Sequence, residues 1–415
     1  MKRLLVYFGK TTSLYLPIII LLIFLTPKTG HGWDISCWIS WARYSFQNGL
    51  ENIYKSDTDY LPLYHYILFI YGKIQGSVDG ISSNIHYLKI LTLLFEFSST
   101  LVLVKLLEEK FKNTYKSILF SLFYFLNIAF LYNSLIWGQV DGIMTFFVFA
   151  SIISGYYKKL ILSMICFMLA LNLKIQGIIF FPIIIVILIP LIKRSYLKFL
   201  LSFIVTLLIQ LLILLPFIWV GDLSKLLNVV FGSVGKYPFV SMNAYNLWYL
   251  FLDGDLMKIQ DSIMYVGLSF KNWGLLLFFV ASFFALYHFI KSTFLYFVKK
   301  QTIEYSLKKL LISSSLIPLL FFFLNTQMHE RYSHPAFIFL TAYSLLYNRS
   351  ILLFLASLAY FLNVEDVLRY FQTNNYQTLI FTPWFIASLY LIIITWLFID
   401  LYEFDFKKMA GKSLV

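Results

Sequence analysis

The sequence predicts an all-α protein that crosses a membrane with about twelve helices. Of its 415 residues, 60% are hydrophobic and only 13% are charged, and apolar runs recur along the whole chain. Ordinary soluble chains carry about twice that share of charged residues, and a soluble fold of this composition would expose large apolar patches. The two cysteines, Cys37 and Cys166, are too few for a disulfide framework, and we expect free thiols.

The first apolar run extends from about Leu14 to Leu25 and follows the basic start Met1-Lys2-Arg3. No small-residue cleavage site comes after it, so we expect a retained first span rather than a signal peptide. Several later runs are shorter than 18 residues, which leaves their boundaries soft. The eleven later apolar runs are 86–104, 117–133, 142–157, 160–173, 177–192, 199–219, 273–290, 310–325, 334–348, 350–364 and 378–399.

The charges predict the orientation of these spans. With the N-terminus in the cytoplasm, most of the 33 basic residues fall in inner segments and most of the 20 carboxylates lie toward the outer face. This distribution is the positive-inside pattern, and it predicts that both termini are cytoplasmic in a multi-pass cell-membrane protein. It also explains the net charge of +13 by attraction to anionic lipids, so we expect a lipid bilayer and no nucleic acid as partner.

Two long outer segments divide the predicted architecture. Residues 1–219 hold the first seven spans with the outer segment 28–62, and residues 220–415 hold the large outer segment 220–272 with five further spans. Segment 62–75 is apolar and aromatic but short, and we interpret it as an interfacial or re-entrant helix. Long aromatic loops on one face predict a site at the outer membrane boundary.

Asp34 follows the first apolar run and lies between two tryptophans, Trp33 and Trp38. Partial desolvation raises the pKa of a carboxyl group, which suits a general base. The alternative is that Asp34 is the N-cap of a following helix, since aspartate is favoured there. The tryptophans can equally be interfacial anchors.

Two polar interruptions fall between apolar runs in the first half of the chain. At Trp137 to Gly142, Gln139 and Asp141 can point into one cavity if the segment is a turn; the alternative is that Asp141 caps the next helix. At Asn172 to Gly177, Lys174 and Gln176 can hold a phosphate, unless Lys174 extends to the lipid headgroups.

Two further clusters lie in the second half. His329, Glu330 and Arg331 stand at the edge of a predicted span, where ionisable groups indicate function. Arg331 can bind a lipid phosphate while Glu330 holds it; the alternative is a structural tie between helices. The histidines lack the HExxH spacing of a metal site. The segment with Asn243, Tyr245, Asn246 and Trp248 alternates rings with amides, which suits either sugar binding or interfacial anchoring.

Taken in order, six elements resemble a family. They are Asp34, Tyr60-Leu61-Pro62-Leu63-Tyr64, Trp137-Gly138-Gln139-Val140-Asp141, Lys174-Ile175-Gln176-Gly177, Asn243-Ala244-Tyr245-Asn246-Leu247-Trp248 and Met328-His329-Glu330-Arg331-Tyr332. The ordered set is similar to the bacterial integral-membrane glycosyltransferases related to the PIG-V mannosyltransferase of GPI-anchor assembly, within the GT-C superfamily. Tyr60-Leu61-Pro62 departs from the usual Tyr-Pro-Pro of that family. This departure affects the expected local shape of the loop more than the expected chemistry.

The resemblance implies a GT-C-like architecture and an inverting transfer of a hexose, with mannose as the family-based expectation. The donor would be a polyprenyl-phosphate sugar, and the acceptor a hydroxyl of a glycan, lipid or protein on the non-cytoplasmic face. Asp34 would be the general base, while the donor phosphate would be held by Arg331, Lys174 and His329. No metal or other cofactor is predicted. Candidate sugar and acceptor contacts are Gln139, Asp141, Gln176, Glu330, Asn243, Tyr245, Asn246 and Trp248.

Two other classes of protein remain open. A surface-polysaccharide polymerase or ligase has similar spans and loops, but usually an arginine-rich large loop, and segment 220–272 contains no arginine. A twelve-span secondary transporter would favour polar residues near the bilayer midplane and halves related by a repeat. Here the polar clusters lie at the ends of the apolar runs, and no such repeat is found.

Overall fold

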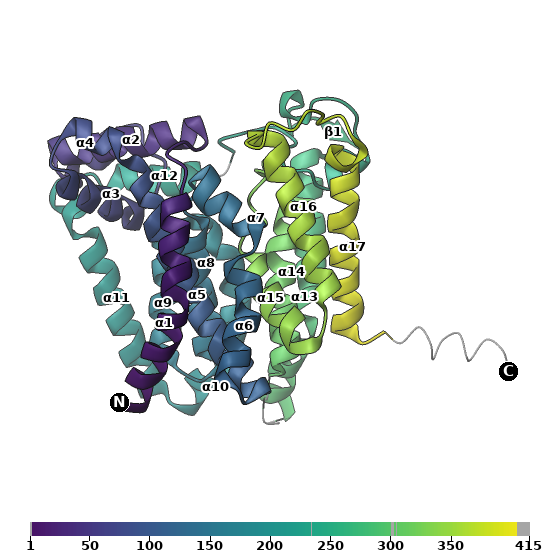
Figure 1. The fold of residues 1–415 in the computed structure, drawn as a ribbon. Helices are drawn as coiled ribbons and strands as arrows, with labels where there is room; N and C mark the ends of the chain where they lie inside the picture. The colour runs from purple at the N-terminus through teal and green to yellow at the C-terminus, as the bar shows by residue number, and fades with distance from the viewer. Residues whose placement is uncertain (1, 234, 300–302, 304, 405–415) are drawn as a thin grey trace. The chain divides into compact units, whose positions relative to one another are not determined.

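The chain folds almost entirely into α-helices in a computed structural model (Figure 1). The structure describes residues 2–233, 235–299, 303 and 305–404. The predicted cytoplasmic location of the C-terminus therefore concerns residues outside the described ranges. The chain forms two compact units, of which the first comprises Met1–Tyr237 and Val364–Thr373 and the second comprises Pro238–Asn363 and Asn374–Val415.

Long helices joined by short turns make up the first unit. Its helical elements are α1 (Lys2–Leu25), α2 (Gly32–Asn48), η1 (Leu50–Lys55), α3 (Pro62–Gln75), α4 (Val78–Ser83), η2 (Ile85–Tyr87), α5 (Leu88–Phe111), α6 (Thr114–Phe125), α7 (Ile128–Leu131), η3 (Tyr132–Trp137), α8 (Asp141–Tyr156), α9 (Leu160–Leu173), η4 (Ile175–Phe180), α10 (Phe181–Arg194), α11 (Tyr196–Trp219) and α12 (Leu223–Gly232).

The second unit adds one small hairpin to its helices. Its elements are η5 (Leu247–Leu250), η6 (Leu256–Lys258), β1 (Met264–Tyr265), β2 (Leu268–Ser269), α13 (Phe270–Lys299), α14 (Leu307–Leu324), α15 (Ala336–Tyr347), α16 (Ser350–Leu368), η7 (Leu379–Phe381) and α17 (Pro383–Tyr402). The strands β1 and β2 pair antiparallel. The last residues of α16, from Val364, are counted with the first unit.

Helix length and hydropathy are those of a membrane protein. Within the described residues, seven helical stretches are long and apolar enough to cross a bilayer. A further pair, Thr114–Phe125 and Ile128–Trp137, qualifies as an eighth span bent by 49°. The remaining predicted runs form the shorter apolar helices Ser13–Leu25, α8, α9 and α15. The seven stretches are Ile85–Phe111, Ile175–Arg194, Tyr196–Trp219, Phe270–Lys299, Leu307–Leu324, Ser350–Leu368 and Pro383–Tyr402.

The predicted outer segment 28–62 is more ordered than the sequence indicates. Segment 28–62 was expected to be a loop, but α2 and η1 occupy most of it. Segment 62–75 is helical as expected and forms α3, which starts with Pro62 in its first turn and is followed by the C-cap residue Gly76 with φ 69°. Proline favours a helix start and glycine a left-handed helix end, so the helix bounds follow from local sequence.

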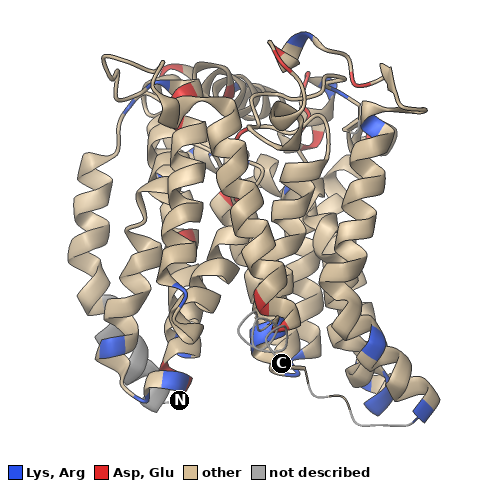
Figure 2. Ribbon diagram, turned by 90° about the vertical axis from the view of Figure 1, so that its right-hand side faces the viewer, with Lys and Arg blue, Asp and Glu red and all other residues tan. Residues whose placement is uncertain are grey.

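Charged residues lie mostly toward the ends of the helices, whose middle sections are nearly free of them (Figure 2). This distribution is expected for helices surrounded by lipid, because a charge in the hydrocarbon region is costly. Glu96 is an exception, because it lies inside the spanning stretch Ile85–Phe111 and is 2% exposed. Both cysteines are free, as expected.

An aromatic core fixes α1 against its neighbours and so places the chain that follows it. The ring of Tyr15 packs edge-on against Phe97 of α5 and Phe125 of α6, with ring centroids 5.2 and 5.6 Å apart. Its hydroxyl is hydrogen-bonded to Ser121 of α6. The connection from α1 to α2 therefore leaves a well-anchored helix.

Candidate functional site

Asp34 lies in the first turn of α2, but it does not cap the helix. The N-cap position belongs to His31, and Asp34 comes three residues later, so the alternative of an N-cap aspartate is wrong. The Oδ2 atom of Asp34 accepts a hydrogen bond from Nε1 of Trp137 at 2.7 Å and lies 3.0 Å from Nδ1 of His31. Asp34 is buried, with 9% of its surface exposed. A carboxylate near the helix N-terminus is also stabilised by the helix dipole.

The turn that contacts Asp34 is the π-helical element η3. Each of its hydrogen-bonding side chains donates to a different buried carboxylate, all within the first unit. π-helical turns are rare and often occur at functional sites. Because its side chains bind four separate carboxylates, η3 organises the polar interior of this unit. The four pairs are Tyr132 with Glu365, Asn133 with Asp141 at 3.3 Å, Ser134 with Glu96, and Trp137 with Asp34.

A buried lysine ties this turn to the connection before α2. Lys89 is 2% exposed, and its ammonium donates to three backbone carbonyls, those of Pro27 at 2.9 Å, Thr29 at 2.5 Å and Leu135 at 2.6 Å. An ammonium has three donors, so all of them are used for backbone atoms. Lys89 thus holds the segment leading to Asp34 against η3.

Close backbone contact completes this attachment. The backbone N–H of His31 donates to the carbonyl oxygen of Trp137 at 2.9 Å. A Cβ atom on Gly30 would stand 2.6 Å from that same oxygen, closer than real side chains allow. Gly30 therefore permits the approach that brings Asp34 to Trp137.

Lys174 forms a buried ion pair in the same unit. Its Nζ lies 2.6 Å from Oδ1 of Asp141, and the two side chains are 7% and 6% exposed. It also donates to Oε1 of Gln139 at 3.4 Å. The alternative that Lys174 extends to the headgroups is therefore wrong. Gln139 and Asp141 both face it, as the turn interpretation predicted, and Asp141 starts α8 without capping it.

Aromatic rings surround this pair and connect it with α2. The Nζ of Lys174 lies 5.3 Å from the ring centroid of Tyr60, and Tyr60 packs against Trp38 and Tyr64, 4.9 and 5.3 Å between centroids. Trp38 is buried, whereas Trp33 is 72% exposed, so only Trp33 keeps the surface exposure of an interfacial anchor. Gln176 is half-buried on η4.

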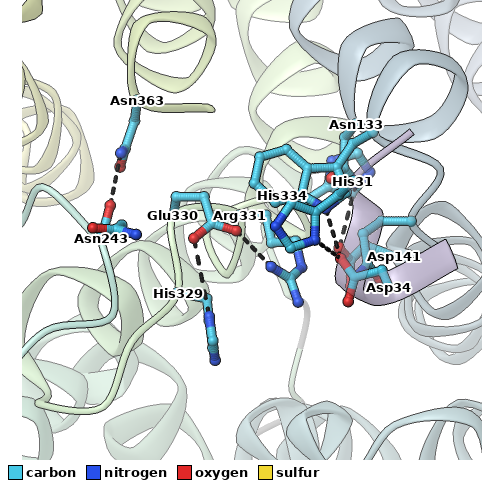
Figure 3. A network of polar contacts seen from close by, with 12 residues as sticks. His31, Asp34, Asn133, Asp141, Asn243, His329, Glu330, Arg331, His334 and Asn363 are labelled. Atoms are coloured by element: carbon cyan, nitrogen blue, oxygen red, sulfur yellow. Dashed lines mark hydrogen bonds and ion pairs between the residues drawn. The ribbon is translucent and has the colours of Figure 1, made fainter. Parts of the chain in front are cut away.

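The cluster around Arg331 lies in the second unit. Nη1 of Arg331 donates to Oε1 of Glu330 at 2.5 Å, and Nδ1 of His329 lies 3.9 Å from Oε2 of the same carboxylate. Figure 3 shows both side chains directed at Glu330. The predicted Glu330–Arg331 contact is present, and it suits both the phosphate-binding and the structural interpretation.

Residues of the predicted sugar-binding segment form hydrogen bonds within the protein. Asn246 is fully buried, and its amide is engaged by backbone atoms, since Nδ2 donates to the carbonyls of Phe322 and Asn325 at 3.2 Å each. The Nδ2 group of Asn246 is therefore already used and is not available to a sugar. We correct the predicted role of Asn246 from sugar binding to a structural one. Asn363 donates to the backbone carbonyl of Asn243 at 2.8 Å and accepts from the backbone N–H of Tyr245 at 3.1 Å.

Trp248 is a further candidate of that segment. It is 5% exposed, packs against Phe270 with ring centroids 5.4 Å apart, and its buried Nε1 has no hydrogen-bond partner in the described part of the chain. Among the described residues no group of three metal-ligating side chains lies together.

The structure thus assigns Asp34, Gln139, Asp141, Lys174 and Gln176 to the first unit, and the other predicted site residues to the second. Sequence reasoning missed His31, Lys89, Glu96 and the donors of η3. Lys89 and Glu96 could have been found, because they stand seven residues apart on one face of an apolar helix, where ionisable groups indicate function. The predicted site residues that lie in the second unit are His329, Glu330, Arg331, Asn243, Tyr245, Asn246 and Trp248.

Comparison with known proteins adds no assignment. No protein-family model matches the chain, and no curated protein matches it. The functional interpretation therefore depends on the residues themselves.

Proposed function

We propose that this protein is a polytopic membrane glycosyltransferase of the GT-C type with about twelve spans. It moves a hexose, mannose by family resemblance, from a polyprenyl-phosphate donor to an acceptor hydroxyl. Transfer takes place with inversion on the non-cytoplasmic face, and both termini are cytoplasmic. The positive-inside distribution of lysine and arginine supports this orientation.

One observation carries the proposal: a buried carboxylate directly after the first apolar helix is held in a defined position. Two donors from different segments, the indole of Trp137 and the imidazole of His31, reach the same oxygen of Asp34. A general base must stand in a fixed geometry relative to the proton that it removes. The attachment by Lys89 and Gly30 supplies that rigidity.

The reaction is an in-line displacement at the anomeric carbon. The acceptor oxygen loses its proton to the base centred on Asp34 and attacks the anomeric carbon, while the bond to the lipid phosphate breaks. The departing phosphate needs positive charge, and Arg331 and His329 are the candidates for this role. Lys174 is a weaker candidate than the sequence indicated, because Asp141 already neutralises its charge.

Gln139 supports a carbohydrate substrate at the Asp34 side. Its side chain is fully buried, and its Nε2 donor has no hydrogen-bond partner in the described part of the chain. A buried unpaired donor is costly, and a sugar hydroxyl could satisfy it. The half-buried Tyr60 provides a ring face on which sugar CH groups could stack.

The test uses purified protein in lipid with a panel of polyprenyl-phosphate sugars, and it measures released polyprenyl phosphate. We expect release with at least one donor, and loss of release in Asp34→Asn, with elution from size exclusion unchanged. Asp255→Asn is the matched control, because Asp255 is an exposed aspartate that contacts Lys258 and the backbone N–H of Met257. Near-normal turnover in Asp34→Asn would refute the assignment of the base. Absence of release from every donor, together with solute counterflow in proteoliposomes, would indicate a transporter instead.

A further inference from the structure

We propose that the proton acceptor of the site is His31, at its Nε2 atom, and that Asp34 orients the imidazole and stabilises its charged form. This inference rests on the proposed glycosyl transfer and changes the role of Asp34 within it. His31 was not among the residues that the sequence singled out.

The hydrogen bond between the two side chains determines which nitrogen is free. Nδ1 of His31 lies 3.0 Å from Oδ2 of Asp34, and an ionised carboxylate can only accept. Nδ1 therefore carries the proton, and Nε2 holds the lone pair. In the described part of the chain, Nε2 has no hydrogen-bond partner, so it is available to a hydroxyl.

Exposure separates the two residues further. The side chain of His31 is 32% exposed, whereas that of Asp34 is 13% exposed. The same Oδ2 atom of Asp34 already receives the Trp137 indole and the imidazole. An incoming acceptor can therefore reach the imidazole more readily than the carboxylate behind it.

The imidazole is held in one orientation. Its ring stacks on the indole of Trp137, with centroids 4.6 Å apart and planes at 21°, and its backbone N–H is bound to the carbonyl of Trp137. Figure 3 shows His31 and Asp34 facing each other. Although His31 is the N-cap residue of α2, its side chain makes no capping bond. The ring is thus positioned for a task other than starting the helix.

The arrangement follows the logic of an aspartate–histidine pair in acyl transfer, where the carboxylate fixes the tautomer and the imidazole takes the proton. In the proposed step, the acceptor O–H bond breaks and its proton moves to Nε2. A bond forms between the acceptor oxygen and the anomeric carbon, and the bond from that carbon to the phosphate oxygen breaks. The phosphate leaves as an anion, and imidazolium beside the Asp34 carboxylate returns its proton to water.

Other charges around the pair do not replace it. Lys89 and Lys28 belong to the segments that frame the connection before α2, and both are cations that cannot accept a proton while charged. The ion pair of Asp59 with Lys236 lies at an exposed position. His65 of α3 is uncharged near neutrality, because burial lowers its pKa to about 3.

The experiment compares three variants in the polyprenyl-phosphate release assay. His31→Asn keeps an amide donor for Asp34 but has no base, and we expect transfer to fall about 100-fold or more. In His31→Ala we expect a similar loss that added imidazole partly restores. His288→Ala on α13 is the control, because it removes a histidine from the second unit, and its rate should equal that of the wild type.

The pH profile gives a readout that a merely structural role would not change. The wild-type rate should have an acid limb, because a protonated imidazole cannot accept the proton of the acceptor hydroxyl, and this limb should disappear in His31→Asn. A His31→Asn rate within twofold of the wild type, or an acid limb that persists in this variant, would overturn the inference. A wild-type protein that releases nothing from any donor would instead defeat the proposed function.

Discussion

The buried ion pair of Asp141 and Lys174 allows the strongest quantitative prediction. Both side chains are almost fully buried and their charged atoms are 2.6 Å apart. Two unit charges attract with about 4 kcal/mol at 4 Å when the effective dielectric constant is about 20. Removing one partner leaves the other charge buried and uncompensated, which typically costs about 3–5 kcal/mol. We expect Lys174→Met and Asp141→Asn each to lower the free energy of unfolding by about this amount.

The double variant tests whether the pair is the cause. Without either charge, the desolvation penalty disappears, and Gln139 and Asn133 lose only one contact each. The double variant should therefore be more stable than the sum of the single effects by about 2–3 kcal/mol.

The assay is denaturant-induced unfolding in mixed micelles, followed by tryptophan fluorescence. The control cycle uses Asp255→Asn and Lys258→Met, a pair of the same chemistry whose side chains are 51% and 82% exposed, for which the coupling should be close to zero. Single effects at 141 and 174 that add within about 0.5 kcal/mol would show that the two charges do not depend on each other and would refute the reasoning.

Three further predictions follow from single contacts. Gln210→Leu on α11 removes the amide pair with Asn172 and should lower the free energy of unfolding by about 0.6–1.7 kcal/mol; unchanged unfolding would contradict a stabilising pair. Tyr132→Phe removes the donor to Glu365 and should cost about 1–3 kcal/mol in the same measurement, and a more stable variant would count against it. Burial lowers the pKa of His65 to about 3 from about 6.5 in the unfolded chain. The stability contributed by the buried neutral imidazole is therefore fully present above pH 6.5 and is lost as the pH falls toward 3. His65→Gln should therefore lose less stability than the wild type between pH 6.5 and 4, and parallel stability curves would argue against this assignment.

Local sequence was sufficient for the helices and for singling out Asp34 as a candidate. Most residues of each of the twelve predicted apolar runs lie in helical segments of the described chain, because the length and hydropathy of a run are properties of neighbouring residues. Seven of these helices reach spanning length. Asp34 was selected for its place after the first run, and the structure buries it. The same local reasoning failed for segment 28–62, since its amphipathic helix α2 carries many polar residues and resembles a loop in composition.

Only the tertiary structure shows what Asp34 contacts. Trp137 lies 103 residues from Asp34 in the sequence, and Tyr132 lies 233 residues from Glu365; no local pattern pairs such residues. The carbonyl contacts of Lys89 depend on how α5 packs, since backbone oxygens carry no sequence signal. The sequence by itself therefore determined which segments are helical and apolar, because that depends on the chemistry of adjacent side chains. Packing decided which buried charges meet, because a buried polar group must find its partner wherever the fold brings one.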